Sequence, residues 1–212
     1  MKNAKAQAAA NYVTDLVNAE TGELNVLYFP GHPKVTRFDA GLGVFTDDEK
    51  TPLSKRGDPF TIRPVAFRLF TDDILGMGKK RWAEFFYVNE ARIMCNLMVH
   101  GYSVDELMKL VPKLFYQQAN ICQVALTLKP FERVSKAEDA KGKKFYICEF
   151  SAVRLTEEEC HMNEMIGSSL KIWRNDTLTG DAITESSRHY RSPIHNTCTV
   201  EPVAEDPATQ AA

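Results

Sequence analysis

The sequence predicts a mainly β protein with one or two short helices, built as a five-stranded barrel with added N-terminal strands. Runs of alternating apolar and polar residues, typical of half-buried strands, recur between residues 60 and 155. One amphipathic stripe with helical spacing interrupts these runs. The chain has 212 residues, of which 44% are hydrophobic and 25% charged. This is the composition of an ordinary globular protein that can bury its own core.

The N-terminal part is predicted to be an arm followed by two strands. Residues 1–23 are polar and alanine-rich, which indicates a flexible arm. Residues 24–29 and 34–38 are rich in apolar, β-forming side chains, and Pro-Gly-His-Pro between them predicts a turn. The charged stretch 47–58, with its proline and glycine, predicts a loop.

Three strands are predicted next. The first covers 60–70, and a loop over 71–80 ends in Lys79, Lys80 and Arg81. The second covers 82–88, and Asn-Glu-Ala-Arg at 89–92 forms a tight turn. The third covers 93–100, with one drier and one wetter face.

A helix is predicted after the third strand. Ser103 and Glu106 have the spacing of a capping box, which marks a helix start. The apolar residues that follow recur at helical spacing; they are Val104, Leu107, Met108, Val111, Leu114 and Phe115. Pro112 is expected to divide the helix into two short pieces, because proline lacks the N–H and crowds the preceding turn.

Two more strands, over 121–129 and 145–155, complete the set. A highly charged hairpin arm over 129–144 joins them, with a turn near Lys141 and Gly142. Beyond Thr156 the regular pattern stops. The sequence therefore predicts a main domain over 24–155, a partly ordered extension over 156–184 and an acidic, disordered tail over 185–212.

The net charge of −2 conceals an uneven distribution. Residues 51–155 carry 17 Lys and Arg against 11 Asp and Glu, whereas residues 156–212 carry 4 against 10. A basic middle suits binding to a polyanion, and an acidic end suits competition with that polyanion or recruitment of basic partners. Chance scatter of surface charge is the alternative explanation.

Cofactors and catalysis are not expected. The five cysteines are widely spaced without a Cys-x-x-Cys pair, which argues against a disulfide framework and a zinc ribbon. Cys160 with His161, and His189 and His195 with Cys198, fit no zinc motif. Asp72–Asp73 and Glu157–Glu159 have no histidine at useful spacing, and the Walker A, Gly-x-Ser-x-Gly and Rossmann motifs are missing. With no apolar run of about 18 residues and no signal-peptide core, a cytoplasmic protein that is not an enzyme is expected.

The order of these elements resembles that of the OB-fold single-stranded-DNA-binding proteins of phages and mobile elements. In that fold, a five-stranded Greek-key barrel carries its helix between strands three and four and an extended binding loop between strands four and five. The resemblance covers residues 60–155. It implies binding of single-stranded DNA without sequence preference during replication, recombination or repair, in the host cytoplasm if the protein is phage-encoded. It also implies a C-terminal tail that recruits replication or recombination proteins. Bacterial relatives end in an acidic tip closed by Pro-Phe, whereas this chain ends in EPVAEDPATQAA.

The candidate binding residues follow from the phase of the second strand. Trp82, Glu84 and Phe86 share one face, and Phe85 lies on the other. Because an unpaired Glu84 is costly to bury, the Trp82 face is predicted to point outward as a platform for base stacking. In the opposite phase Tyr87 and Arg81 point outward and Trp82 belongs to the core. The predicted nucleic-acid-binding residues are Arg68, Lys79, Lys80, Arg81, Trp82, Phe86, Arg92, His100, Phe131, Arg133, Lys143, Lys144 and Tyr146, with Lys136 and Lys141 in the same hairpin arm. The rival interpretation is a β-rich interaction or structural module whose aromatic face binds another subunit.

Overall fold

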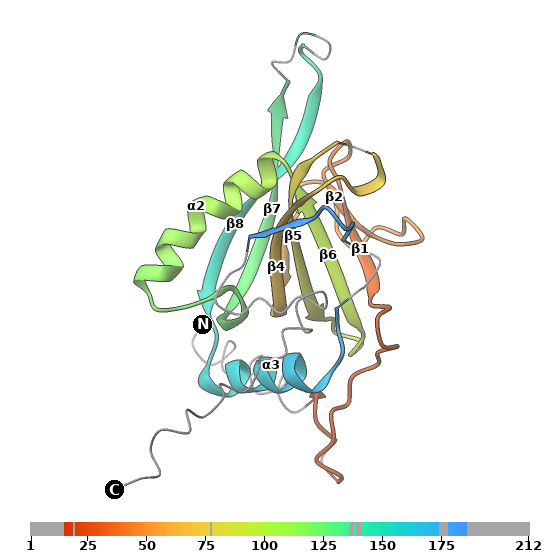
Figure 1. Ribbon diagram of the computed structural model, residues 1–212, viewed down its shortest axis with the longest axis vertical. Helices are drawn as coiled ribbons and strands as arrows, with labels where there is room; N and C mark the ends of the chain where they lie inside the picture. Colours follow the sequence, from red (N-terminus) through yellow and green to blue (C-terminus); the bar gives the residue numbers. More distant parts are fainter. Residues whose placement is uncertain are drawn as a thin grey trace, which may run out of the picture.

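Nine strands form two sheets in the part of the chain that the computed structural model describes, which is residues 15–18, 20–76, 78–135, 138, 141–173 and 178–185. The larger sheet has the order β2-β1-β6-β5-β4-β9, and the smaller one the order β3-β7-β8 (Figure 1). The strands are β1 (Lys34–Asp39), β2 (Val44–Asp47), β3 (Phe60–Ile62), β4 (Pro64–Asp72), β5 (Lys80–Val88), β6 (Met94–His100), β7 (Val124–Val134), β8 (Lys144–Arg154) and β9 (Ile183–Glu185). The helices are α2 (Tyr102–Tyr116) and α3 (Glu157–Ser169), with short 3-10 turns at Ile74–Gly76 and Ile121–Gln123.

The predicted mainly β class is confirmed, and the predicted closed barrel is not found among the described residues. A single residue, Arg63, separates β3 from β4, so one bent segment pairs with β7 in the smaller sheet and with β5 in the larger one. β4, β5 and β6 are antiparallel neighbours, and so are β7 and β8. Nothing pairs β6 with β8 in these ranges; instead β6 pairs in parallel with β1, from Lys34↔Cys95 to Arg37↔Met98.

The larger hydrophobic core lies between the two sheets. Its fully buried members come from both sheets and include Phe85, Leu97, Leu126 and Leu128. The helix α2 covers one side of this core with buried residues Val104, Leu107, Leu110 and Leu114. Phe85 therefore lies in the core, as the strand pattern predicted.

The N-terminal strands differ from the prediction. Residues 24–29 form isolated bridges rather than a strand; Leu27, for example, bridges Ile93. Besides β6, β1 pairs with β2, a strand that the sequence pattern did not indicate. β2 follows a turn in which the Asp39 carboxylate accepts hydrogen bonds from the backbone amides of Gly41 and Leu42. Gly43 has φ +68°, and a Cβ there would come within 2.7 Å of the Tyr146 ring. The turn therefore packs directly against the beginning of β8.

The predicted capping box at Ser103 is wrong. The N-cap of α2 is Gly101, which has no side chain for capping, and the Ser103 hydroxyl instead accepts a hydrogen bond of 3.0 Å from the Cys148 amide of β8. Pro112 does not divide the helix either. Burial of Leu110 and Leu114 on either side of the proline holds the helix continuous, and packing outweighs the lost hydrogen bond.

A second helix, α3, lies where no regular structure was predicted. The Thr156 hydroxyl and the Glu159 carboxylate form a reciprocal capping box, and Met162 and Ile166 are buried. Figure 1 shows α3 across one end of the larger sheet. Its apolar side packs with Ile172 and Trp173 against the outer face of β4, β5 and β6, forming a smaller core. Residues on this outer face are consequently covered by a second layer.

The termini lie outside the described residues, namely 1–14 and 186–212. Leu16, at the end of the predicted arm, is buried in the smaller core. The predicted tail, residues 185–212, carries four acidic residues against two basic ones. The other six of the ten acidic residues after Thr156 precede it in the sequence.

Neither described helix is long and apolar enough to cross a membrane.

Candidate nucleic-acid interface

The predicted stacking platform on the outer face of β5 is buried. Trp82 is 6% exposed, and Phe86 and Arg68 are inaccessible. The Phe86 ring packs edge-on against Trp173, with 5.2 Å between the ring centroids. The prediction that these three side chains form an exposed surface is therefore wrong. The alternation along β5 was correct, but it could not show that α3 and Trp173 cover the second face.

A buried polar network compensates the Glu84 carboxylate, which lies in the protein interior. Arg68 donates from Nε to Glu84, and the Asn96 amide donates to the other carboxylate oxygen at 3.0 Å. The guanidinium carbon of Arg68 lies 5.3 Å from the Phe70 ring and 5.4 Å from the Trp173 ring. Because all three polar side chains are fully buried, their role is to hold the sheet and its cover together.

A row of aromatic rings crosses the larger sheet at the end where β6 stops. Phe70, Trp82 and His100 are paired in register on β4, β5 and β6. Their exposure increases along the row, since Phe70 is fully buried and His100 is exposed. The Trp82 and His100 rings lie 4.6 Å apart, and the indole N–H donates to the Asp72 carbonyl at 3.3 Å. The row is accessible at its β6 end.

A cleft of about 360 Å³ opens beside His100; we call it the seam cleft. The cleft exists because β1 pairs with β6 only as far as Met98. Beyond that point, β8 contacts the turn after β1, where the Tyr146 amide donates a 2.7 Å hydrogen bond to the Ala40 carbonyl. The side chains that line it include five rings and one cation, namely Phe38, His100, Tyr102, Phe145, Tyr146 and Lys80.

The mouth of the seam cleft combines exposed rings with positive charge. Tyr102 is 58% exposed, and its ring centroid lies 6.0 Å from that of Phe145. The guanidinium of Arg133 lies 5.7 Å from the Tyr102 ring and pairs with Glu106 at 3.4 Å. Burial, with a smaller contribution from Lys80, lowers the pKa of His100, so this ring is neutral at pH 7 and can stack on another ring.

The remaining predicted cations are distributed around this end of the molecule. Lys79 and Lys143 are exposed. Lys144 is also exposed and pairs with Glu132 at 2.8 Å, and the Tyr146 hydroxyl donates to the same carboxylate. Figure 1 shows the paired ends of β7 and β8 projecting beyond the other strands, near the β4–β5 connection. Phe131 is half-exposed on this projection, Lys141 is exposed, and Lys136 lies outside the described residues.

Two predicted binding residues do not line the seam cleft: Arg92 is distant from it, and Arg81 is bound to another side chain. Arg92 belongs to the β5–β6 turn, and β6 places it roughly 20 Å from His100. Arg81 forms a two-pronged ion pair with Glu185 of β9. The structure thus gathers Lys80, His100, Arg133 and Tyr146, and it adds Tyr102 and Phe145, which sequence reasoning missed. Phe145 directly follows the predicted hairpin arm over 129–144, whereas Tyr102 stands between the third predicted strand and the predicted helix and had no such signal.

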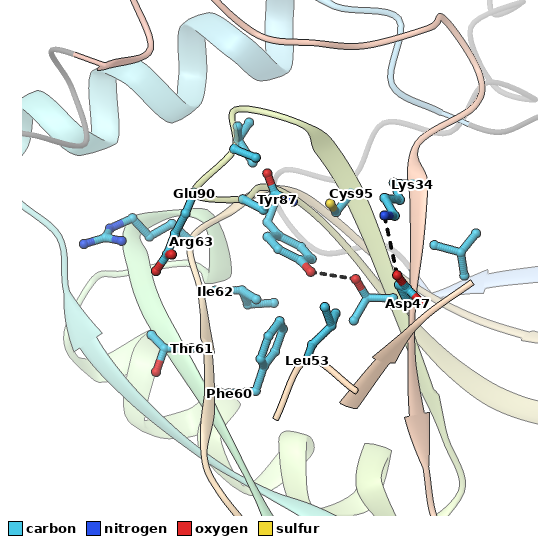
Figure 2. Close-up of a pocket in the computed structure, with 15 residues that line it drawn as sticks. Lys34, Asp47, Leu53, Phe60, Thr61, Ile62, Arg63, Tyr87, Glu90 and Cys95 are labelled. Carbon is cyan, nitrogen blue, oxygen red and sulfur yellow. Dashed lines mark hydrogen bonds and ion pairs between the residues drawn. The ribbon is translucent and has the colours of Figure 1, made fainter. Parts of the chain in front are cut away.

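A second cleft of about 440 Å³ lies at the end of the sheet where the β5–β6 turn is found (Figure 2). Figure 2 shows Phe60, Ile62 and Leu53 around the buried Tyr87, whose hydroxyl shares a 2.7 Å hydrogen bond with Thr36. The opposite phase of β5, with Tyr87 outward, is therefore also wrong.

The charges of this second cleft are balanced. Lys34 pairs with Asp47 at 3.6 Å, and Arg63 at the rim pairs with Glu159 at 3.1 Å. Burial raises the pKa of Cys95 to about 11, so the thiol is protonated at neutral pH. The cleft offers neither free positive charge nor an activated nucleophile, and it does not favour a polyanion.

No group of three or more metal-ligating side chains is gathered in the described ranges. The Asp72 carboxylate has another role, because it accepts a hydrogen bond of 2.8 Å from the Thr179 amide. His189, His195 and Cys198 lie outside the described residues. Comparison with known proteins gives no matching family model, curated protein or solved structure.

Proposed function

We propose that the protein binds single-stranded DNA without sequence preference and that the seam cleft holds its bases. The observation that carries the proposal is the meeting of exposed rings and cations in one cleft. Tyr102, Phe145 and His100 supply flat surfaces for bases, and Lys80 in the lining supplies charge for phosphates. Arg133, which also pairs with Glu106, lies over the Tyr102 ring and adds charge at the mouth. A volume of about 360 Å³ is within the range of roughly 300–1,000 Å³ that pockets for small ligands occupy.

The connectivity supports an OB-type barrel that is opened along one side. The segment β3–β4 pairs with β7 at one end and with β5 at the other, and α2 lies between the third and fourth strands of the set. The N-terminal hairpin β1–β2 then occupies the β6 edge, so that a sixth strand replaces direct closure between β6 and β8. In this proposal the seam cleft is what remains of the opening. The assignment to replication, recombination or repair rests on the resemblance, and those to the cytoplasm and to protein partners of the tail rest on the sequence composition.

Titration with labelled oligo-dT tests the proposal. Binding through three to five phosphate contacts should give a slope of log affinity against log salt of about −2 to −3.5, at about −0.7 for each contact on single strands. Failure to shift oligo-dT at low salt and micromolar protein would contradict DNA binding.

Replacing Tyr102 by Ala should weaken oligo-dT binding by about 1–3 kcal/mol, because one stacked base loses its ring. The folding midpoint should stay unchanged, since the side chain is largely exposed. The matched control is Tyr116→Ala at the other end of α2, where the ring is 84% exposed and distant from the seam cleft. Equal binding by both variants and the parent would exclude the seam cleft as the base site.

A protein-interaction module is the second candidate, and one observation favours it. Phe115 and Tyr116 at the end of α2 are 75% and 84% exposed, and their rings pack edge-on with centroids 5.6 Å apart. Exposed aromatic pairs are typical of interfaces. Binding to another protein through this pair would survive high salt, whereas the proposed DNA binding would not.

A further inference from the structure

The last described segment, residues 178–185, lies along the outer edge of β4; we call it the strap. β9 at its end pairs with β4 through Leu69↔Glu185, Phe70↔Thr184 and Thr71↔Ile183. At its beginning, the Thr179 amide and hydroxyl donate to the Asp72 carboxylate. β9 thereby forms the edge of the larger sheet next to β4. The strap therefore begins close to the β4–β5 connection and runs back along β4 to Leu69.

Glu185 engages Arg81 in the geometry that a phosphate would use. Arg81 donates from Nε to one carboxylate oxygen at 3.0 Å and from Nη2 to the other. The Thr71 hydroxyl adds a third hydrogen bond of 3.2 Å to the first oxygen. Two parallel N–H···O bonds from one guanidinium are the arrangement in which arginine binds carboxylates and phosphates alike.

The Arg81 backbone lies next to residues of the seam cleft, its side chain reaches across β4 to Glu185 of β9, and the ion pair remains accessible. Arg81 directly follows Lys80, and its carbonyl accepts from the Gly101 amide at 3.4 Å; Lys80 and Gly101 both line the cleft. The side chains of Arg81 and Glu185 are 35% and 34% exposed, so an anion from solvent can reach them.

The strap itself is held weakly. β9 has three residues, and Ile183, its large apolar side chain, is 60% exposed. Burial of apolar surface is the main source of docking energy, and this strand contributes little of it. The backbone pairing with β4 and the polar contacts at Asp72 and Arg81 therefore supply most of what keeps the strap in place.

We propose that Glu185 occupies a phosphate subsite next to the seam cleft and that the strap competes with the DNA backbone for Arg81. This inference rests on the proposed function and concerns its regulation. DNA that enters the cleft gains a further phosphate contact when the Glu185 carboxylate leaves. With the strap docked, the protein thus binds DNA below its intrinsic affinity.

Glu185→Gln tests the inference, because it removes the charge while keeping a side chain of the same shape. One additional phosphate contact should make the salt slope for oligo-dT steeper by about 0.7 and raise the affinity roughly eightfold at 50 mM salt, with the gain vanishing near 1 M. Hydrogen exchange of the Leu69–Thr71 amides reports whether β9 remains paired.

Two variants serve as charge-matched controls. Asp181→Asn changes the net charge equally within the strap but leaves the Arg81 pair intact, so it should not raise the affinity. The double variant Arg81→Gln/Glu185→Gln has the parental net charge but lacks the guanidinium. It should not show the increase in oligo-dT affinity that is expected for Glu185→Gln.

Equal gains in Asp181→Asn and Glu185→Gln, or a gain that persists in the double variant, would overturn the inference in favour of diffuse repulsion. An unchanged affinity in Glu185→Gln, with oligo-dT still bound by the parent, would also overturn it while leaving the proposed function standing. Absence of binding in every variant contradicts the proposed function itself.

Discussion

Glu84→Gln is expected to lower the free energy of unfolding by about 3–5 kcal/mol, the usual cost of breaking a buried ion pair by removing one partner. The guanidinium of Arg68 is fully buried, and Glu84 is its charge partner. Its two terminal nitrogens have no hydrogen-bond partner among the described residues, so the positive charge would lose its remaining compensation. Thermal denaturation should show a fall in Tm of roughly 6–20 °C for a chain of this length.

Two further variants distinguish the cost of leaving a buried charge unpaired from the effect of losing any charged side chain. Glu132→Gln breaks the exposed pair with Lys144 and should leave the midpoint nearly unchanged. Replacing both partners, as Arg68→Met/Glu84→Leu, removes the buried charges together and should recover much of the loss. A midpoint in Glu84→Gln as high as in Glu132→Gln would show that the network is hydrated.

Trp82→Ala should cost about 3–5 kcal/mol of folding free energy, as large-to-small changes in cores do. The ring is 6% exposed, lies against His100 and donates its N–H to the Asp72 carbonyl. Oligo-dT affinity per folded molecule should persist, because the proposed base site is the seam cleft. Chemical denaturation gives the first quantity, and titration at a temperature well below the midpoint gives the second.

Fluorescence checks the same point while Trp82 stays in place. In a Trp173→Phe background, measured at a temperature well below its own midpoint, the emission of Trp82 should be insensitive to saturating oligo-dT, since the indole is covered. Strong quenching, together with an unmoved midpoint for Trp82→Ala, would return the base site to the outer face of β5. Trp82→Phe serves as the milder control, because it keeps an aromatic ring in contact with His100.

The order of the central strands was predictable because each strand carries its own signal. β5 and β6 alternate with a period of two, and the tight turn at residues 89–92 fixes their register. Which face of β5 meets solvent was not predictable from this pattern. Glu84 reads as a solvent-facing residue until its partner Arg68, on the neighbouring strand, is known.

The cover on the outer face had a local signal that went unused. Thr156 and Glu159 have capping-box spacing, and Met162 and Ile166 follow at helical intervals. The same spacing at Ser103 predicted a cap that does not exist, because the hydroxyl serves β8 instead. A short capping motif therefore locates a helix start without showing what its side chain binds.

The seam cleft could not have been located from the sequence. Its position depends on where the parallel pairing of β1 with β6 ends, and such pairing leaves no periodic signal in either strand. Lys80 and Tyr146 were selected for their residue types and loop positions, whereas Arg68, Trp82, Phe86 and His100 were selected for a strand face on which Arg68, Trp82 and Phe86 proved to be buried.

The parallel pairing of β1 with β6 also determines the order of assembly. The paired residues, such as Lys34 and Cys95, are about sixty positions apart, so β1 leaves the ribosome before its partner exists. At roughly 5–20 residues per second, the interval is roughly 3–12 s. The β1–β2 hairpin can form during this interval, but one edge of β1 stays unpaired. Lys34 and Arg37 on this edge strand carry positive charge, which disfavours pairing with the same strand of a neighbouring nascent chain.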